Sequence, residues 1–213
     1  MSTFAAPGLA ALRLNELLAE AGQAELDSAT AARFEAYFHL LVRWNSRMNL
    51  TALRDDEKIF SRHFVESIAC ARALPAEIGS LLDFGSGAGF PGLPIALCRP
   101  ELRVTLAESQ GKKAGFLREA VRTLGVEAEV HGGRAEALAG KFDCVTLRAV
   151  DRMQEAVRAA AGLVGRGGWL AILTTDAESA GMRAAAGPGF AWKSGAVLPG
   201  GESRILVLGR AQG

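Results

Sequence analysis

The chain has 213 residues, of which 49% are hydrophobic and 22% charged, and this length and composition fit one globular domain, with or without a small addition. The formal net charge of +1 argues against a protein that holds long nucleic acid by charge alone, so any such binding is expected to use local patches. No apolar stretch approaches the roughly 20 residues of a membrane helix, and the first residues lack the pattern of a secretory signal.

Residues 1–75 have helical spacing and are expected to form a helical segment packed on the core. The first helix is predicted from about Leu9 to Gly22, and Asp27 or Ser28 is the expected cap of the second. A third helical stretch covers about 57–73, and Pro75 ends the region.

Residues 76–213 alternate between short apolar runs and longer helical patterns, which predicts an α/β domain with a mainly parallel sheet. Helices are expected at 112–124 and 154–163, whereas 177–189 is expected to be irregular or partly helical. The last two strands read as an antiparallel hairpin joined by Pro199-Gly200-Gly201. The predicted strands are 80–84, 102–107, 128–131, 142–147, 169–173, 190–198 and 204–208.

A glycine loop, Gly85-Ser86-Gly87-Ala88-Gly89, follows the first strand and predicts a ligand that approaches the backbone closely. Phe90 stands where a dinucleotide fingerprint has its third glycine. Asp83 precedes the loop, and an acid there suits a ligand with a cationic end better than a pyrophosphate. The loop therefore favours S-adenosylmethionine over a dinucleotide.

Polar residues follow the next strands as well. Glu108 ends the second strand and is placed to accept both ribose hydroxyls. Gly132, Gly133 and the acid Glu136 come after the third strand, where glycines and an acid fit the adenine edge, and Arg148 follows the fourth. Because the carboxyl ends of parallel strands share one edge of a sheet, these groups are expected to line one crevice.

Several segments together resemble the bacterial ribosomal RNA small-subunit methyltransferase G family, also called glucose-inhibited division protein B. The resemblance spans about 43–208. It rests on Trp44-Asn45-Ser46-Arg47-Met48-Asn49-Leu50-Thr51, Arg62-His63-Phe64-Val65-Glu66-Ser67, the run from Asp83 to Gly92, Glu108-Ser109 with Lys112-Lys113, Arg134-Ala135-Glu136, Arg148-Ala149 and Glu202-Ser203-Arg204.

The resemblance implies a class I S-adenosylmethionine-dependent methyltransferase: a Rossmann-like, mainly parallel seven-stranded sheet with an antiparallel C-terminal hairpin and an N-terminal helical extension. It implies methylation of guanine N7 in 16S ribosomal RNA, with cofactor contacts at Gly85, Phe90, Ala135, Glu136 and Arg148. It places Asn45, Asn49 and His63 on the substrate side, although each also suits a capping or packing role. One departure is Leu173-Thr174-Thr175-Asp176, where members commonly have Lys-Gly after the fifth strand.

Guanine N7 has a free lone pair at neutral pH, so the reaction needs positioning rather than an obligatory catalytic acid, base or nucleophile. The substrate, 16S RNA or the small ribosomal subunit, is expected to be held by basic residues near the crevice. Cys70, Cys98 and Cys144 lack metal-ligand spacing, so we expect no metal, and we expect a cytoplasmic monomer. The candidate RNA contacts are Arg47, Arg62, Lys112, Lys113, Arg148 and Arg204.

Three other functions stay open at this point. The chain could methylate another RNA, a protein or a small molecule, with the helical segment as a lid over the substrate. It could be a nicotinamide-dependent oxidoreductase on a similar sheet, although Asp83 and Phe90 argue against this. It could also be a non-catalytic ribosome-assembly factor that binds S-adenosylmethionine only as a structural ligand.

Overall fold

A computed structural model describes residues 4, 6–53, 55–199 and 203–212. Its sheet has eight strands, seven of them in the order β3-β2-β1-β4-β5-β8-β6, and the short β7 pairs with β8. The first five strands run parallel, and β8 is antiparallel to β5, β6 and β7. The predicted fold class is confirmed. The strands are β1 (Ser80–Phe84), β2 (Arg103–Ala107), β3 (Ala128–His131), β4 (Phe142–Arg148), β5 (Val164–Thr175), β6 (Phe190–Trp192), β7 (Ala196–Val197) and β8 (Arg204–Ala211).

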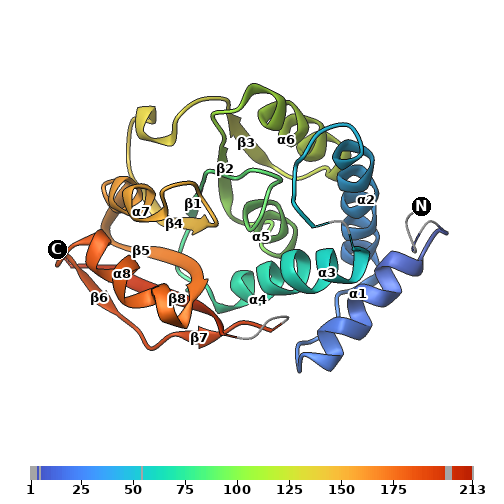
Figure 1. The fold of residues 1–213 in the computed structure, drawn as a ribbon, viewed down its shortest axis with the longest axis horizontal. Helices are drawn as coiled ribbons and strands as arrows, with labels where there is room; N and C mark the ends of the chain where they lie inside the picture. The colour runs from blue at the N-terminus through green and yellow to red at the C-terminus, as the bar shows by residue number, and fades with distance from the viewer. Residues whose placement is uncertain (1–3, 5, 54, 200–202, 213) are drawn as a thin grey trace.

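Helices cover both faces of the sheet, with α7 and α8 on one side and the remaining α-helices on the other (Figure 1). Neighbouring strand residues such as Leu81 and Leu82 point to opposite faces and enter two different apolar clusters. The helices are α1 (Leu9–Glu20), α2 (Ser28–Asn45), α3 (Asp56–Ile59), η1 (Phe60–Val65), α4 (Glu66–Ala73), α5 (Gly92–Cys98), α6 (Gly111–Leu124), η2 (Ala135–Ala137), α7 (Met153–Ala161) and α8 (Asp176–Ala186).

The N-terminal helices α2 and η1 pack against each other through a cluster of aromatic rings. Phe60 stacks on Phe38 with ring centroids 4.6 Å apart, and Phe34 meets Phe64 edge to face at 5.9 Å. Asp27 caps α2 by accepting the backbone N–H groups of Ala29 and Thr30, as its sequence position predicts. The same apolar cluster contains side chains from α1 and from the sheet, so the boundary near residue 75 stays a prediction.

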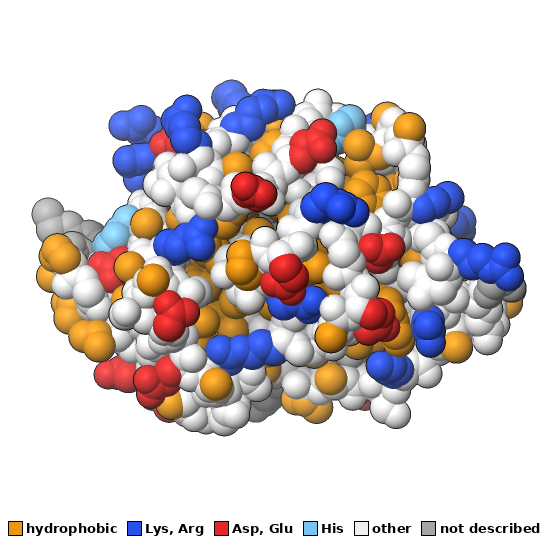
Figure 2. Space-filling view, turned by 180° about the vertical axis from the view of Figure 1, so that it is seen from behind, with side chains coloured by type: hydrophobic (Ala, Val, Ile, Leu, Met, Phe, Trp, Pro, Cys, Tyr) orange, Lys and Arg blue, Asp and Glu red, His pale blue; other side chains and the backbone are white. Residues whose placement is uncertain are grey.

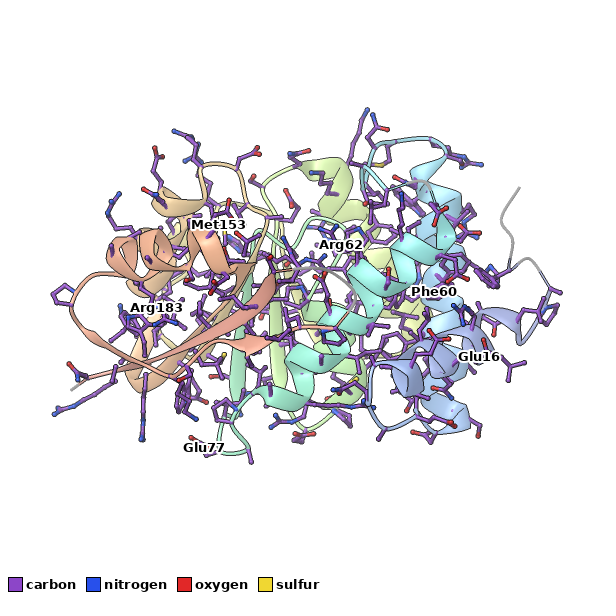
Figure 3. The ribbon with its side chains drawn as sticks, turned by 60° about the horizontal axis from the view of Figure 1, so that its bottom comes forward. Glu16, Phe60, Arg62, Glu77, Met153 and Arg183 are labelled. Carbon is purple, nitrogen blue, oxygen red and sulfur yellow. The ribbon has the colours of Figure 1, made fainter. Side chains whose placement is uncertain are left out.

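A π-helical segment, η1, joins α3 to α4 within the third helical stretch. A π turn is wider than an α turn and is frequent at functional sites. In Figure 3, Phe60 lies on the side of the N-terminal helices, whereas Arg62 lies toward the centre of the molecule. The π segment thus sends an apolar side chain into the helical layer and a polar one toward the edge of the sheet.

Two C-terminal segments differ from the sequence-based prediction. Residues 176–186 form a regular helix, α8, because the Thr175 hydroxyl accepts the N–H of Glu178 and caps it. The single strand expected at 190–198 is divided into β6 and β7. The proposed Gly200-Gly201 turn lies outside the described residues, but β8 does pair antiparallel with both short strands. No described helix is long and apolar enough to cross a membrane.

Candidate active site

A hollow of about 550 Å³ lies at the carboxyl edge of the sheet, where β1, β2 and β4 end. The glycine loop, Glu108 and Arg148 line it from the sheet side. The loop 50–53 together with Arg62 and His63 lines it from the N-terminal helical side. The crevice therefore lies between the sheet and the helical segment, as parallel-sheet topology favours.

The glycine loop turns sharply under the hollow through residues with positive φ. Gly85 has φ +72°, and a Cβ there would lie 3.0 Å from a methyl group of Val150. Gly89 has φ +93°, and a Cβ there would lie 2.5 Å from Leu93 Cδ1 and 2.7 Å from Tyr37 Oη. Gly85 lines the hollow, whereas Gly89 allows the loop to pack against α2 and α5.

Asp83 is buried beneath the loop and is not among the residues that line the hollow. Its carboxylate accepts the backbone N–H of Gly92 at 3.1 Å and the hydroxyl of Thr146 at 3.0 Å. Burial raises its pKa to about 6, while these hydrogen bonds act in the opposite direction. The sequence-based expectation that Asp83 faces a cationic ligand group therefore needs correction, because the carboxylate instead fixes the start of α5.

Glu108 joins the glycine loop to the end of β2. Its Oε2 accepts the backbone N–H of Gly87 at 2.9 Å, and its Oε1 accepts that of Gln110 at 2.7 Å. The side chain is largely buried but lines the hollow. Because each carboxylate oxygen has two lone pairs, acceptor capacity remains for ligand hydroxyls.

A second hollow of about 240 Å³ adjoins the first and shares Gly85, Ser109, Val150 and Asp151 with it. Ala135 and Glu136 line this second hollow. Ala135 is buried on the helical turn η2, and the Glu136 side chain is exposed. The two hollows together extend from the end of β3 to the end of β4.

Three arginines surround one buried acid at the far wall of the larger hollow. Glu66 is fully buried; Arg148 Nη2 lies 3.2 Å from its Oε2, and Arg62 Nε lies 3.3 Å from its Oε1. Arg204 Nη2 lies 3.7 Å from Glu66 Oε2. Burial lowers the pKa of Arg148 to about 10 and raises the pKa of Glu66, although the paired charges oppose both shifts. With three guanidinium groups around one carboxyl group, this group of residues has an excess of positive charge.

His63 lies beside this group and stacks on Phe90, with ring centroids 4.8 Å apart and planes inclined by 22°. Phe90 also stacks on Tyr37 at 5.2 Å. His63 Nε2 lies 2.7 Å from Thr51 Oγ1. Burial, followed by the charges of Arg148 and Arg62, lowers the pKa of His63 to about 3, so the ring is neutral at physiological pH.

The structure brings most of the predicted site residues to the two hollows but leaves five elsewhere, one of which is the buried Asp83. Asn45 ends α2 and accepts the N–H groups of Leu50 and Thr51, so it shapes the loop that lines the hollow. Asn49 and Lys112 are exposed and lie outside both linings, and Gly89 packs beneath the loop. The predicted residues lining one or both hollows are Gly85, Gly87, Phe90, Glu108, Ala135, Glu136, Arg148, His63 and Arg204.

Several residues of the site had no role assigned from sequence. Glu66 was noted only within a motif, because a charged residue inside a helical pattern is normally taken as part of a solvated face. Ser109 and Asp151 line both hollows and follow β2 and β4, so the same strand-end reasoning that identified Glu108 applies to them. Thr51 was noted only within a motif, and it contacts His63.

Basic side chains also gather next to the site. Figure 2 shows Lys and Arg side chains along the upper left of one face, over the region of α6 and the end of α2. Helix α6 contains four basic residues and one acid. Lys113 lines the larger hollow from this helix, and Lys112 is exposed beside it. The patch therefore reaches the mouth of the hollow.

Residues 30–186 match the family model described as GidB: rRNA small subunit methyltransferase G. The chain is 46% identical over 173 residues to Ribosomal RNA small subunit methyltransferase G of Stenotrophomonas maltophilia (strain K279a), covering 80% of this chain and 79% of that protein. It is 45% identical over 153 residues to the protein of the same name from Halorhodospira halophila, covering 71% and 72% of the two chains.

Solved structures of lower sequence identity share the fold. A SAM-dependent O-methyltransferase from Thermotoga maritima superposes with a TM-score of 0.57 at 13% identity, covering 81% of this chain and 71% of that one. An O-methyltransferase from Bacillus cereus in complex with SAH gives a TM-score of 0.54 at 17% identity, covering 82% and 90%.

Proposed function

This chain belongs to the rRNA small subunit methyltransferase G family, and on that premise we propose that it transfers a methyl group from S-adenosylmethionine to N7 of a guanine in 16S ribosomal RNA. The observation that carries the proposal is the pair of adjoining hollows that share Gly85 at the carboxyl edge of the sheet. One extends toward the end of β3, and the other is open to the basic patch on α6.

The residues present fit the cofactor. Gly85 lacks a side chain where the loop meets the hollow, and Glu108 has acceptor capacity left for ribose hydroxyls. Arg148 Nη1 is buried without a hydrogen-bond partner, which leaves a donor available for a ligand group. We propose that the cofactor contacts Gly85, Gly87, Phe90, Glu108, Ala135, Glu136 and Arg148, with Asp83 and Gly89 supporting the loop from below.

The bound cofactor supplies a methyl group activated on a sulfonium. The acceptor would be the free lone pair of guanine N7, and the residues that line the larger hollow would orient it toward this methyl group. No proton is removed from N7, so the residues of this chain need only bind, orient and exclude water. This agrees with a site whose histidine stays neutral and is hydrogen-bonded to the hydroxyl of Thr51 rather than to a carboxylate.

The RNA is proposed to reach the hollow across the basic face of α6, with Lys112, Lys113 and Arg204 on the substrate side. Asn45 and Asn49 would act there through the loop 46–53, because Asn45 anchors that loop to α2. We propose a cytoplasmic site of action, since that is where bacterial ribosomal RNA is found. Action as a monomer stays a prediction.

The direct test is to map 7-methylguanosine in small-subunit ribosomal RNA from cells that lack this protein. We expect one modified guanine to lose its methyl group, and unchanged modification would contradict the proposal. Methyl transfer from labelled cofactor to naked 16S RNA and to purified small subunits then identifies the preferred substrate. Calorimetry with S-adenosylhomocysteine and with NAD separates the methyltransferase from a dehydrogenase, and turnover separates it from a non-catalytic assembly factor.

A further inference from the structure

The His63 ring occupies an unusual position for a polar side chain, between the aromatic core and the candidate active site. One face is covered by Phe90, with centroids 4.8 Å apart, and Phe90 in turn stacks on the fully buried Tyr37 at 5.2 Å. The Tyr37 hydroxyl donates to the carbonyl of Ala88 in the glycine loop at 2.5 Å. This column of three rings is therefore anchored both in the helical layer and in the loop beneath the hollow.

A hydrogen bond also fixes one edge of the His63 ring. Nε2 lies 2.7 Å from Thr51 Oγ1, and the same Thr51 oxygen accepts the N–H of Leu53 at 3.2 Å. Thr51 belongs to the loop that Asn45 fixes at the end of α2. With one face packed and one edge hydrogen-bonded, the His63 ring has a fixed orientation where it lines the hollow.

We propose that the His63 imidazole is a stacking platform for the target guanine of the substrate RNA. This rests on the proposed function, and it assigns to His63 the binding of a purine base rather than of a phosphate or of the cofactor. Proteins that select an unstacked base commonly replace its lost neighbour with an aromatic ring. The ring also has a chemical advantage, because methylation at N7 makes the purine cationic and the face of an uncharged ring tolerates a cation.

Because positive charges surround His63, a neutral imidazole ring is better suited than a protonated one to bind a cationic purine. Arg62, Arg148 and Arg204 face His63, and Glu66 is the acid paired with them among the described residues. A protonated imidazole would add to their excess positive charge and repel the methylated purine. The burial and arginine charges that keep the pKa of His63 at about 3 therefore support the stacking role, which the geometry already indicates.

The test measures RNA affinity of the full-length protein saturated with S-adenosylhomocysteine, so that no reaction occurs. The probe is 16S RNA or small subunits from cells lacking the protein, whichever the wild type binds. His63→Phe keeps a flat ring without hydrogen-bonding atoms, His63→Gln keeps a hydrogen-bonding group without a ring, and His63→Ala keeps neither. His39→Ala, at a half-exposed histidine on α2 outside the hollow, is the matched control.

We expect His63→Phe to retain RNA affinity within about threefold, whereas His63→Gln and His63→Ala lose about fivefold or more. Affinity for S-adenosylhomocysteine should change little in all three, and the melting temperature of each variant shows that it is folded under the assay conditions. A glutamine that preserves RNA binding while phenylalanine abolishes it would overturn stacking in favour of hydrogen bonding. Equal loss of S-adenosylhomocysteine affinity would assign His63 to the cofactor. If wild-type protein neither binds nor methylates 16S RNA, the proposed function fails instead.

Discussion

Glu66 and Arg148 form a buried ion pair, with 3.2 Å between Oε2 and Nη2, at a junction between the helical segment and the sheet. Arg62 and Arg204 converge on the same carboxylate. A single acid thus connects η1, β4 and β8 at the wall of the hollow. The energetics of this junction and of the glycine loop lead to five predictions.

Glu66→Gln should lower the free energy of unfolding by about 3 kcal/mol, because it leaves buried arginine charge without its counter-ion. Urea denaturation at neutral pH measures the change. Glu101→Gln is the matched control, because Glu101 also pairs with an arginine but is exposed. A midpoint for Glu66→Gln no lower than that of the control would show that the arginines do not depend on this carboxylate.

Asp83→Asn should remove a pH dependence of stability. The folded protein holds the Asp83 proton up to a pKa of about 6, whereas the ordinary value is 3.8. The folded state therefore binds more protons between these values, and its stability falls as pH rises through this window. The unfolding free energy of the wild type relative to Asp83→Asn should fall by up to about 3 kcal/mol from pH 4 to pH 7. A constant difference between the two proteins would refute the shift.

Gly89→Ala should destabilise the protein by about 2 kcal/mol or more, because the new methyl group meets Leu93 and Tyr37 and the backbone has φ +93°. S-adenosylhomocysteine should also bind more weakly, since the loop must move. Gly115→Ala adds the same methyl group within α6, where no atom lies within 4 Å, and should stabilise by about 0.5 to 1 kcal/mol. Thermal unfolding of both variants makes the comparison, and equal effects would count against a steric role for Gly89.

Glu108→Gln should weaken S-adenosylhomocysteine binding about tenfold or more. It replaces a charged acceptor and leaves the N–H of Gly87 or Gln110 facing an amide nitrogen. Isothermal calorimetry gives the dissociation constant. Glu129→Gln changes an exposed acid on the neighbouring strand β3 and should leave affinity unaltered. If both variants bind equally well, Glu108 is not part of the cofactor site.

Replacing Lys112 and Lys113 by Gln should weaken RNA binding and reduce the slope of log affinity against log salt by roughly 1.5, as expected for two lost phosphate contacts. The control replaces Lys141 and Arg166, which are exposed at the amino-terminal edge of the sheet, away from the hollow. Affinity measured from 50 to 200 mM salt distinguishes the two pairs. An unchanged slope for the α6 pair would remove the basic patch from the RNA path.

The strands whose ends form the site could be predicted from the sequence. The apolar runs Ser80–Phe84 and Ala128–His131 are bounded by turn-forming or polar residues, and the observed strands have those same limits. Because parallel strands present their carboxyl ends on one edge, Gly85, Glu108 and Arg148 could be assigned to one crevice before any coordinates. Local pattern was sufficient here, because short runs between turn-forming or polar residues are typical of strands in a parallel sheet.

Which of these groups face the hollow, and which are buried behind it, depends on tertiary packing. Asp83 precedes the glycine loop by two residues, yet its carboxylate turns inward because Gly92 and Thr146 offer donors there. The pairing of Glu66 with Arg204 and the stacking of His63 on Phe90 join distant parts of the chain. Such contacts depend on how helices pack on the sheet, and hydrophobic periodicity specifies a buried face without specifying its partner.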